Sequence, residues 1–150
     1  MGRHHHARTL IHLARERHIT DVSNLKLQKL LYYAPAWNLA FTGASRFPND
    51  IEAWVHGPAI PVVFRRFKAL GWSTIELPVI PHQDANLSRH LRSVLTSYGR
   101  FSATQPERLT HSEGPWLKAR KGLAPDVPSH AVISCNDMKE FYRAQLRGTR

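Results

Sequence analysis

Apolar residues recur along most of this chain at the three- and four-residue spacing of amphipathic helices. A short apolar run at 10–14 predicts a first helix that ends near His18. The strongest signal extends from Leu25 to about Phe41, where we expect one long helix. Four residues form its predicted apolar face: Leu27, Leu30, Leu31 and Ala34.

The ends and the middle of this long helix carry their own signals. Asn24 suits the N-cap, because its side chain accepts a hydrogen bond from a free backbone N–H of the first turn. Thr42-Gly43 ends the helix, since glycine tolerates the left-handed conformation of a C-cap. Pro35 lacks a backbone N–H and clashes with the preceding turn, so we expect a kink or break near 31–34.

Four later segments also have helical spacing. One spans 61–70 and starts with a proline, and the next spans 87–98. A third covers about 106–121 with an interruption at Gly114-Pro115. Asn136 suits the N-cap of the last helix. The predicted buried face of that helix consists of Met138, Phe141, Tyr142 and Leu146.

Three short segments have the composition of strands: 51–55, 74–79 and 131–134. Pro78 would confine the second of them to an edge or an end. The chain has no internal repeat and no linker long enough to divide it. The sequence therefore predicts a mainly α (α+β) fold, a single compact domain over 1–150 with about six helices and a small three-stranded sheet. The first seven residues are expected to be flexible.

Composition narrows the class of protein. The chain has 150 residues, of which 42% are hydrophobic and 21% charged, as in globular domains. No apolar run approaches the roughly 20 residues that span a bilayer. The single cysteine, Cys135, excludes an internal disulfide framework and favours a reducing compartment. We therefore expect a soluble cytoplasmic protein.

The charge points to the kind of partner. Lysine and arginine total 21 against 11 acidic residues, and the formal net charge of +10 attracts polyanions and acidic protein surfaces alike. Nucleic acid and an acidic protein stay open as equal alternatives, because the cations are scattered and form no block of five or more. They fall into three small groups: Arg65, Arg66 and Lys68; Lys118, Arg120 and Lys121; Arg143 and Arg147.

Signals for catalysis are weak. The chain contains no HExxH, CxxC, GxSxG or Walker motif. Cys135 has no identifiable partner base and is expected to behave as a small buried hydrophobe. The three histidines at 4–6 lie at the chain end and are excluded from the interpretation of the fold.

Four local motifs carry a family resemblance. They are NLKLQKLLYYA at 24–34 followed by Trp37, IEAWVHGP at 51–58, LTHSEGPW at 109–116, and the C-terminal segment 127–146. In order and spacing they resemble the Panacea domain of SocA-like antitoxins and their phage-associated relatives. The chain departs from this family at two places. Pro35-Ala36 replaces the usual Gln-Gly, and His56 replaces the aromatic residue that usually precedes Gly-Pro.

The resemblance implies a non-enzymatic antitoxin of a prokaryotic or phage type II toxin–antitoxin system. Such a protein binds and neutralises a cognate protein toxin, and it needs no cofactor and no metal. The resemblance does not identify the toxin. DNA and a protease stay open as further partners, and the rival interpretation is a nucleic-acid-binding regulator that represses its own operon. Against that rival, the sequence has no convincing helix-turn-helix.

Candidate partner-binding residues cluster first on the long helix, at Lys26, Gln28, Lys29, Tyr33 and Trp37. They form a recognition face if the aromatic residues are anchors, since aromatic residues dominate interface hot spots. In the alternative interpretation the aromatic residues pack in the core and the lysines are merely solvated. The core is favoured for the aromatic residues, and the two interpretations are equal for the lysines.

Two other groups are candidates for the same surface. Glu52, Trp54 and His56 alternate along a predicted strand and would share one face as part of a binding groove. The favoured interpretation is that Trp54 is core and that Glu52 pairs with a buried lysine or a backbone group.

His111, Glu113 and Trp116 form the third group. A histidine and a glutamate two residues apart can share a metal or a proton relay, but a catalytic metal normally takes three protein ligands. A structural role at the helix ends around the Gly-Pro step is therefore favoured.

Overall fold

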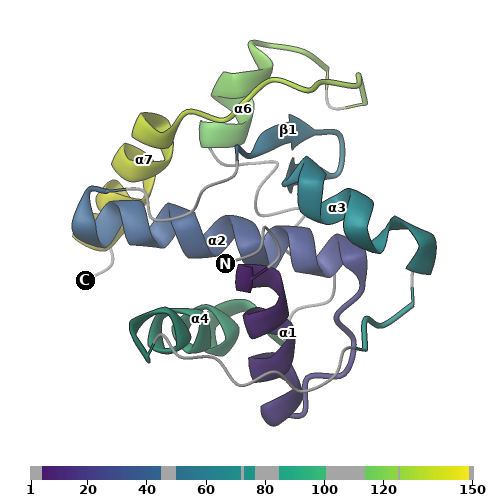
Figure 1. Ribbon diagram of the computed structural model, residues 1–150. Helices are drawn as coiled ribbons and strands as arrows, with labels where there is room; N and C mark the ends of the chain where they lie inside the picture. Colours follow the sequence, from purple (N-terminus) through teal and green to yellow (C-terminus); the bar gives the residue numbers. More distant parts are fainter. Residues whose placement is uncertain are drawn as a thin grey trace.

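The computed structural model of the chain describes residues 5–44, 50–71, 73–76, 85–100, 114–124 and 126–148. The fold is mainly helical with one small sheet, as predicted (Figure 1). Its elements are, in order, α1 (His5–Glu16), α2 (Asn24–Thr42), β1 (Glu52–Trp54), β2 (Gly57–Ala59), α3 (Pro61–Phe67), the short 3-10 helix η1 (Lys68–Leu70), α4 (Ala85–Tyr98), α6 (Gly114–Arg120) and α7 (Cys135–Gly148).

Helix α2 is the centre of the molecule. It crosses the middle of Figure 1, with α1 and α4 on one side and β1 and α6 on the other. It packs against α1, α3, α4, α7 and β2, and 15 of its 19 residues are buried. A helix at a protein surface buries only one stripe, whereas a helix enclosed on all sides buries its polar positions as well. The predicted apolar face of α2 is therefore only part of what the fold buries.

The boundaries of α2 agree with prediction, but its cap and its middle do not. Ser23 is the N-cap, and its hydroxyl accepts a hydrogen bond from the backbone N–H of Lys26 at 3.3 Å; Asn24 is already helical. Gly43 ends the helix with a φ of 77°, as expected. The helix continues past Pro35 without interruption, so a break near 31–34 is wrong, while a kink there stays a prediction. The elements packed around α2 stabilise the helical turn that contains Pro35.

The sheet is smaller than predicted. Strands β1 and β2 form a two-stranded antiparallel hairpin, in which Glu52 lies opposite Ala59 and Trp54 opposite Gly57. The predicted strand 131–134 contributes a single bridge, from Val132 to Glu52, to the other edge of β1. Residues 74–76 form no strand, and the rest of the predicted strand 74–79 lies outside the described residues.

The remaining helices follow the predicted order. Helices α3 and η1 cover 61–70, and α4 buries Leu91, Val94 and Leu95 as expected. Residues 106–113 of the predicted third segment lie outside the described part, which resumes with α6. Helix α1 begins at His5 and therefore includes residues 5–7 of the segment that was expected to be flexible.

Three predictions about helix α7 (Cys135–Gly148) differ from the structure. Ser134, not Asn136, caps it, because the Ser134 hydroxyl accepts a hydrogen bond from the backbone N–H of Asp137 at 3.2 Å. Cys135 is exposed at its start rather than buried. Leu146 is 40% exposed, although the spacing placed it on the buried face. In the described part of the chain, no helix has both the length and the apolar character needed to cross a membrane.

Candidate functional site

A buried polar relay fastens α3 to the first turns of α2. The side-chain amide of Gln28 donates to Asn24 Oδ1 at 3.0 Å, and Asn24 Nδ2 donates to the Phe64 carbonyl at 3.0 Å. Gln28 Oε1 accepts the backbone N–H of Ile60 at 2.7 Å, just where α3 begins. Both side chains are almost completely buried. Because each buried polar atom in the relay has a partner, these two residues stabilise the fold instead of facing a ligand.

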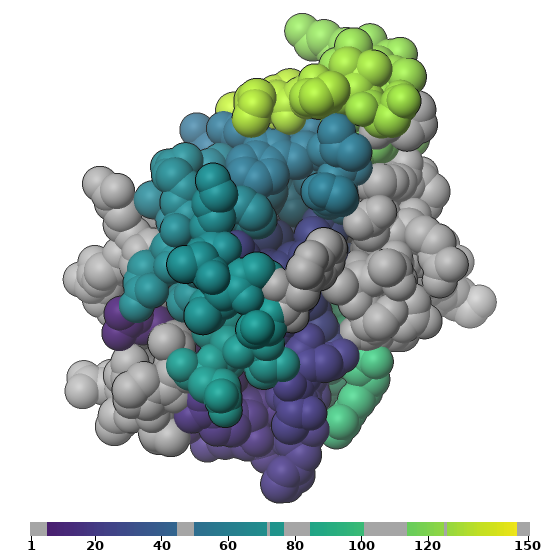
Figure 2. All heavy atoms as spheres, turned by 90° about the vertical axis from the view of Figure 1, so that its right-hand side faces the viewer, coloured from purple at the N-terminus to yellow at the C-terminus, as the bar shows by residue number. Residues whose placement is uncertain are grey.

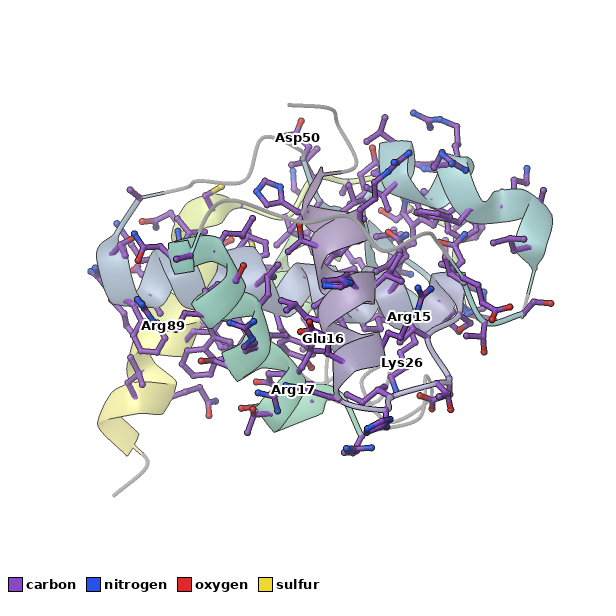
Figure 3. The ribbon with its side chains drawn as sticks, turned by 60° about the horizontal axis from the view of Figure 1, so that its bottom comes forward. Arg15, Glu16, Arg17, Lys26, Asp50 and Arg89 are labelled. Carbon is purple, nitrogen blue, oxygen red and sulfur yellow. The ribbon has the colours of Figure 1, made fainter. Side chains whose placement is uncertain are left out.

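Lys26 makes a second buried connection, to the turn after α4. Its Nζ lies 2.6 Å from Asp21 Oδ1 and 2.6 Å from the Gly99 carbonyl oxygen, and the lysine itself is fully buried (Figure 3). Lys29 is also buried, at 1% exposure. A buried ammonium group is costly unless it is paired and hydrogen-bonded. The interpretation of these lysines as solvated is therefore wrong.

The hairpin is held by α6. Trp116 Nε1 donates to the Trp54 carbonyl at 2.9 Å, and the Arg120 guanidinium donates to the Ala53 carbonyl at 3.0 Å. Arg120 also donates to carbonyl groups of the loop that follows α6, and its guanidinium lies 4.6 Å from the centre of the Trp116 ring. Arg120 is only 2% exposed. The sequence grouped it with the scattered cations Lys118 and Lys121, since its charge alone does not distinguish it from them.

Glu52 and Trp54 share one face of β1, as predicted. Glu52 Oε1 accepts from Trp54 Nε1 at 2.8 Å and lies 3.3 Å from His130 Nδ1. Its partners are thus an indole and a histidine, in place of the buried lysine or backbone group that was expected. Trp54 is half-buried, with its ring edge-on to Phe64, and His56 is exposed in the hairpin turn.

Aromatic rings fill the space between α2, α4 and α7. The Tyr33 ring stacks on Tyr98 with their centroids 3.7 Å apart. Trp37 Nε1 donates to the Tyr98 hydroxyl at 2.9 Å, and the Trp37 ring lies 4.9 Å from that of Tyr142. Tyr32 and Tyr33 are fully buried, which confirms the core interpretation for them. Trp37 is only partly buried, because its outer edge reaches the surface.

An open groove begins at that edge of Trp37. We call it the α2–α4–α7 groove, and its volume is about 220 Å³. It is lined by Trp37, Phe41, His90, Ser93, Val94, Ser97, Tyr98 and Leu146. Two large apolar side chains stand at its rim, Phe41 with 62% of its surface exposed and Leu146 with 40%. Aromatic and apolar side chains from three helices meet solvent here.

The predicted site residues differ in whether they reach the groove, are buried, or lie outside the described residues. Of the candidates, Trp37 alone lines the groove, and His111 and Glu113 lie outside the described residues. Five candidates are buried and cannot contact a partner in this structure: Lys26, Gln28, Lys29, Tyr33 and Trp116. Among the groove residues, Phe41 and Leu146 were missed as surface residues. No local signal was present for Phe41, because it lies seven residues after Ala34 and therefore on the predicted apolar face.

The part of the chain that the structure describes contains no candidate metal site. Within the residues that the structure describes, no three histidine, cysteine, aspartate or glutamate side chains gather closely enough to hold a metal ion.

Comparison with known proteins gives a clear relationship. The family model for the antitoxin SocA-like Panacea domain matches residues 27–117. Antitoxin SocA of Caulobacter vibrioides (strain NA1000 / CB15N) is 37% identical over 138 residues, an alignment that covers 83% of this chain and 73% of that protein. No solved structure matches significantly. The family model begins inside α2 and extends into α6, and so includes α4 and most of α2, two of the three helices that line the groove, but not α7. The chain therefore belongs to the antitoxin SocA-like family, which the Panacea domain defines.

Proposed function

We propose that this chain is the antitoxin of a type II toxin–antitoxin system and neutralises a protein toxin by binding it directly. Family membership carries the proposal: the domain match spans 27–117, and the relative at 37% identity is named an antitoxin. The geometry is compatible with binding, because Phe41 and Leu146 expose apolar surface beside a groove on a rigid aromatic base. Neutralisation then results from covering the toxin's working surface, without chemistry on either chain.

The affinity that this mechanism needs can be estimated. If both proteins are present at about 1 µM, keeping free toxin to about 1% requires a Kd of about 0.1 nM, near −14 kcal/mol. Interfaces of ordinary size reach this affinity when a few buried anchors supply most of it. A weak, purely electrostatic association would leave too much toxin free.

Co-expression tests the proposal. The products of the reading frames next to this gene are expressed alone and together with the full chain, and growth and co-elution are scored. We expect one neighbour to arrest growth, and this chain to restore growth while forming a stable complex with that neighbour. Neighbours that are harmless alone, or a toxic neighbour that neither binds nor is neutralised, would overturn the antitoxin assignment.

One observation favours a second function, regulation of its own operon by binding DNA. Arg65, Arg66 and Lys68 are all exposed on α3 and η1, the teal elements that face the viewer in Figure 2, and the whole chain has a net charge of +10. Cations on one surface bind the phosphate backbone, but sequence preference needs contacts with base edges.

A mobility-shift titration tests this second function. DNA from upstream of the gene is compared with unrelated DNA near 150 mM salt. A preference of about 1,000-fold or more supports a regulator. Equal affinity for both DNAs leaves only non-specific attraction. Delivery of a bound toxin to a protease stays a prediction. The complex from the co-expression experiment is the material with which to test it.

A further inference from the structure

The α2–α4–α7 groove is preformed. Trp37 is held from two sides, by its hydrogen bond to the Tyr98 hydroxyl at 2.9 Å and by ring contact with Tyr142. Tyr98 is in turn fixed by stacking on Tyr33, which is fully buried. His90 Nε2 lies 2.6 Å from the Ala34 carbonyl oxygen, and this contact ties α4 to the middle of α2. A surface that is already ordered avoids much of the entropy cost of binding.

The volume of the groove limits the size of the group that can bind in it. Pockets for small molecules usually measure about 300–1,000 Å³. A volume of about 220 Å³ is smaller, and it suits one or two apolar side chains. Phe41 and Leu146 extend the apolar surface beyond the groove itself, as expected where an anchor residue enters and the rest of a peptide segment lies across the rim.

The charged residues around the groove indicate the charge that a partner should carry. Helices α2 and α4 contain no acidic residue, and α7 has none after Glu140. Two arginines stand beside groove-lining residues without being part of the lining themselves. Arg89 is exposed on α4 next to His90, and Figure 3 shows it on the side of the molecule where α7 lies. Arg143 donates from Nε to the Ala40 carbonyl at 2.9 Å, beside Phe41. The rim is therefore cationic, and the floor is apolar.

We infer that the α2–α4–α7 groove is the docking surface for an amphipathic segment of the toxin, in which apolar anchors are flanked by aspartate or glutamate. This inference rests on the proposed antitoxin function and identifies the surface and the chemistry of the partner. A helix that places apolar residues at i, i+3 or i+4 on one face and carboxylates beside them matches both floor and rim. A second copy of this chain fits less well, because each copy brings a net charge of +10 and the same arginines to the contact.

The test uses the full chain and the growth-arresting neighbour from the co-expression experiment. Phe41→Glu and Leu146→Glu place a carboxylate at the apolar rim, and Arg89→Glu reverses one rim charge. Leu123→Glu is the matched control, since Leu123 is 45% exposed but lies after α6, outside the groove lining. All four sites are exposed, so each variant should fold, and equal thermal unfolding curves check this.

We expect Phe41→Glu and Leu146→Glu each to weaken the Kd for the toxin by about 30-fold or more and to lose growth protection. Arg89→Glu should slow association several-fold at low salt, and Leu123→Glu should behave like the wild type. Replacing the toxin's acidic residues one at a time by lysine should identify one that weakens binding to the wild type and restores binding to the Arg89→Glu variant.

The failure of this inference is distinguishable from the failure of the proposed function. If the wild type does not bind or neutralise the toxin, the proposed function fails and the inference fails with it. If the wild type binds but both rim variants bind equally well, the antitoxin function stands and the docking surface lies elsewhere. A wild-type dimer that Phe41→Glu dissociates, with toxin binding unchanged, would assign the groove to a second copy and would overturn the inference as well.

Discussion

Lys26 is a lysine without exposed surface, and its contacts determine its role. Its Nζ reaches an exposed carboxylate, Asp21, and a buried backbone carbonyl, that of Gly99. The ion pair with a 60% exposed partner contributes little by itself. The hydrogen bond to Gly99 matters more, because a buried carbonyl without a donor costs about 1–3 kcal/mol. Lys26 therefore connects α2 to the end of α4.

Replacing Lys26 by methionine should lower the free energy of unfolding by about 2 kcal/mol, since the apolar stem is kept but the Gly99 carbonyl loses its donor. Urea denaturation followed by circular dichroism measures the change. Lys118→Met is the control. Its Nζ lies 3.9 Å from Asp137 with 70% of the side chain exposed, so the loss should stay within about 0.5 kcal/mol. Equal losses for the two variants would contradict the structural role of Lys26.

At the scale of the element, α2 shows how tertiary packing sustains a helix that its own sequence weakens. Pro35 cannot donate to the Leu31 carbonyl, and its ring crowds the preceding turn. The element nonetheless runs from Asn24 to Thr42 without interruption, with neighbours on several sides. Most of the stability of helices in proteins comes from such packing, with propensity contributing less.

The helix should therefore become more stable when the proline is removed. Pro35→Ala restores the donor and relieves the crowding, while the small cavity and the freer unfolded chain offset part of the gain. We expect a net increase of about 1 kcal/mol in the free energy of unfolding, measured by urea denaturation.

Pro115→Ala is the matched control for this change. Pro115 lies in the first turn of α6, where the missing N–H costs nothing and the fixed φ is favourable. Its replacement should lower the free energy of unfolding by about 0.5–1 kcal/mol. Opposite signs for the two substitutions support the assignment of strain to position 35, whereas a loss of stability at both would refute it.

At the scale of the whole molecule, charge and apolar surface have separate tasks. The net charge of +10 acts over about a Debye length, near 10 Å at 0.1 M salt, and accelerates encounter with an acidic surface. The apolar contacts of the groove act only after contact, and they determine how long the complex lasts.

Salt should therefore affect association more than dissociation. Raising NaCl from 0.05 to 0.5 M should slow association of the chain with its toxin by about tenfold, and dissociation should change by less than about threefold. Stopped-flow or surface-plasmon measurements give both rate constants. Association that is independent of salt would argue against an acidic partner.

The sequence by itself determined the features that depend on local patterns. Helical spacing located α1, α2, α3 and α4, and Gly43 marked the end of α2, because periodicity and backbone conformation are properties of neighbouring residues. Short motifs also indicated the family. The sheet was harder to predict from the sequence, since the bridge at Val132 depends on a contact with β1 about eighty residues earlier.

Tertiary structure alone decided which polar and aromatic residues are enclosed. Lys26 and Arg120 resemble surface cations in the sequence, but each also donates to a carbonyl group far away in the chain, 73 and 67 residues from it. Phe41 and Leu146 resemble core residues by type, yet the helices leave them at a rim. Burial depends on what the rest of the chain places around a residue, and no local pattern records that. For this reason the helices could be predicted from the sequence, whereas the groove required the structure.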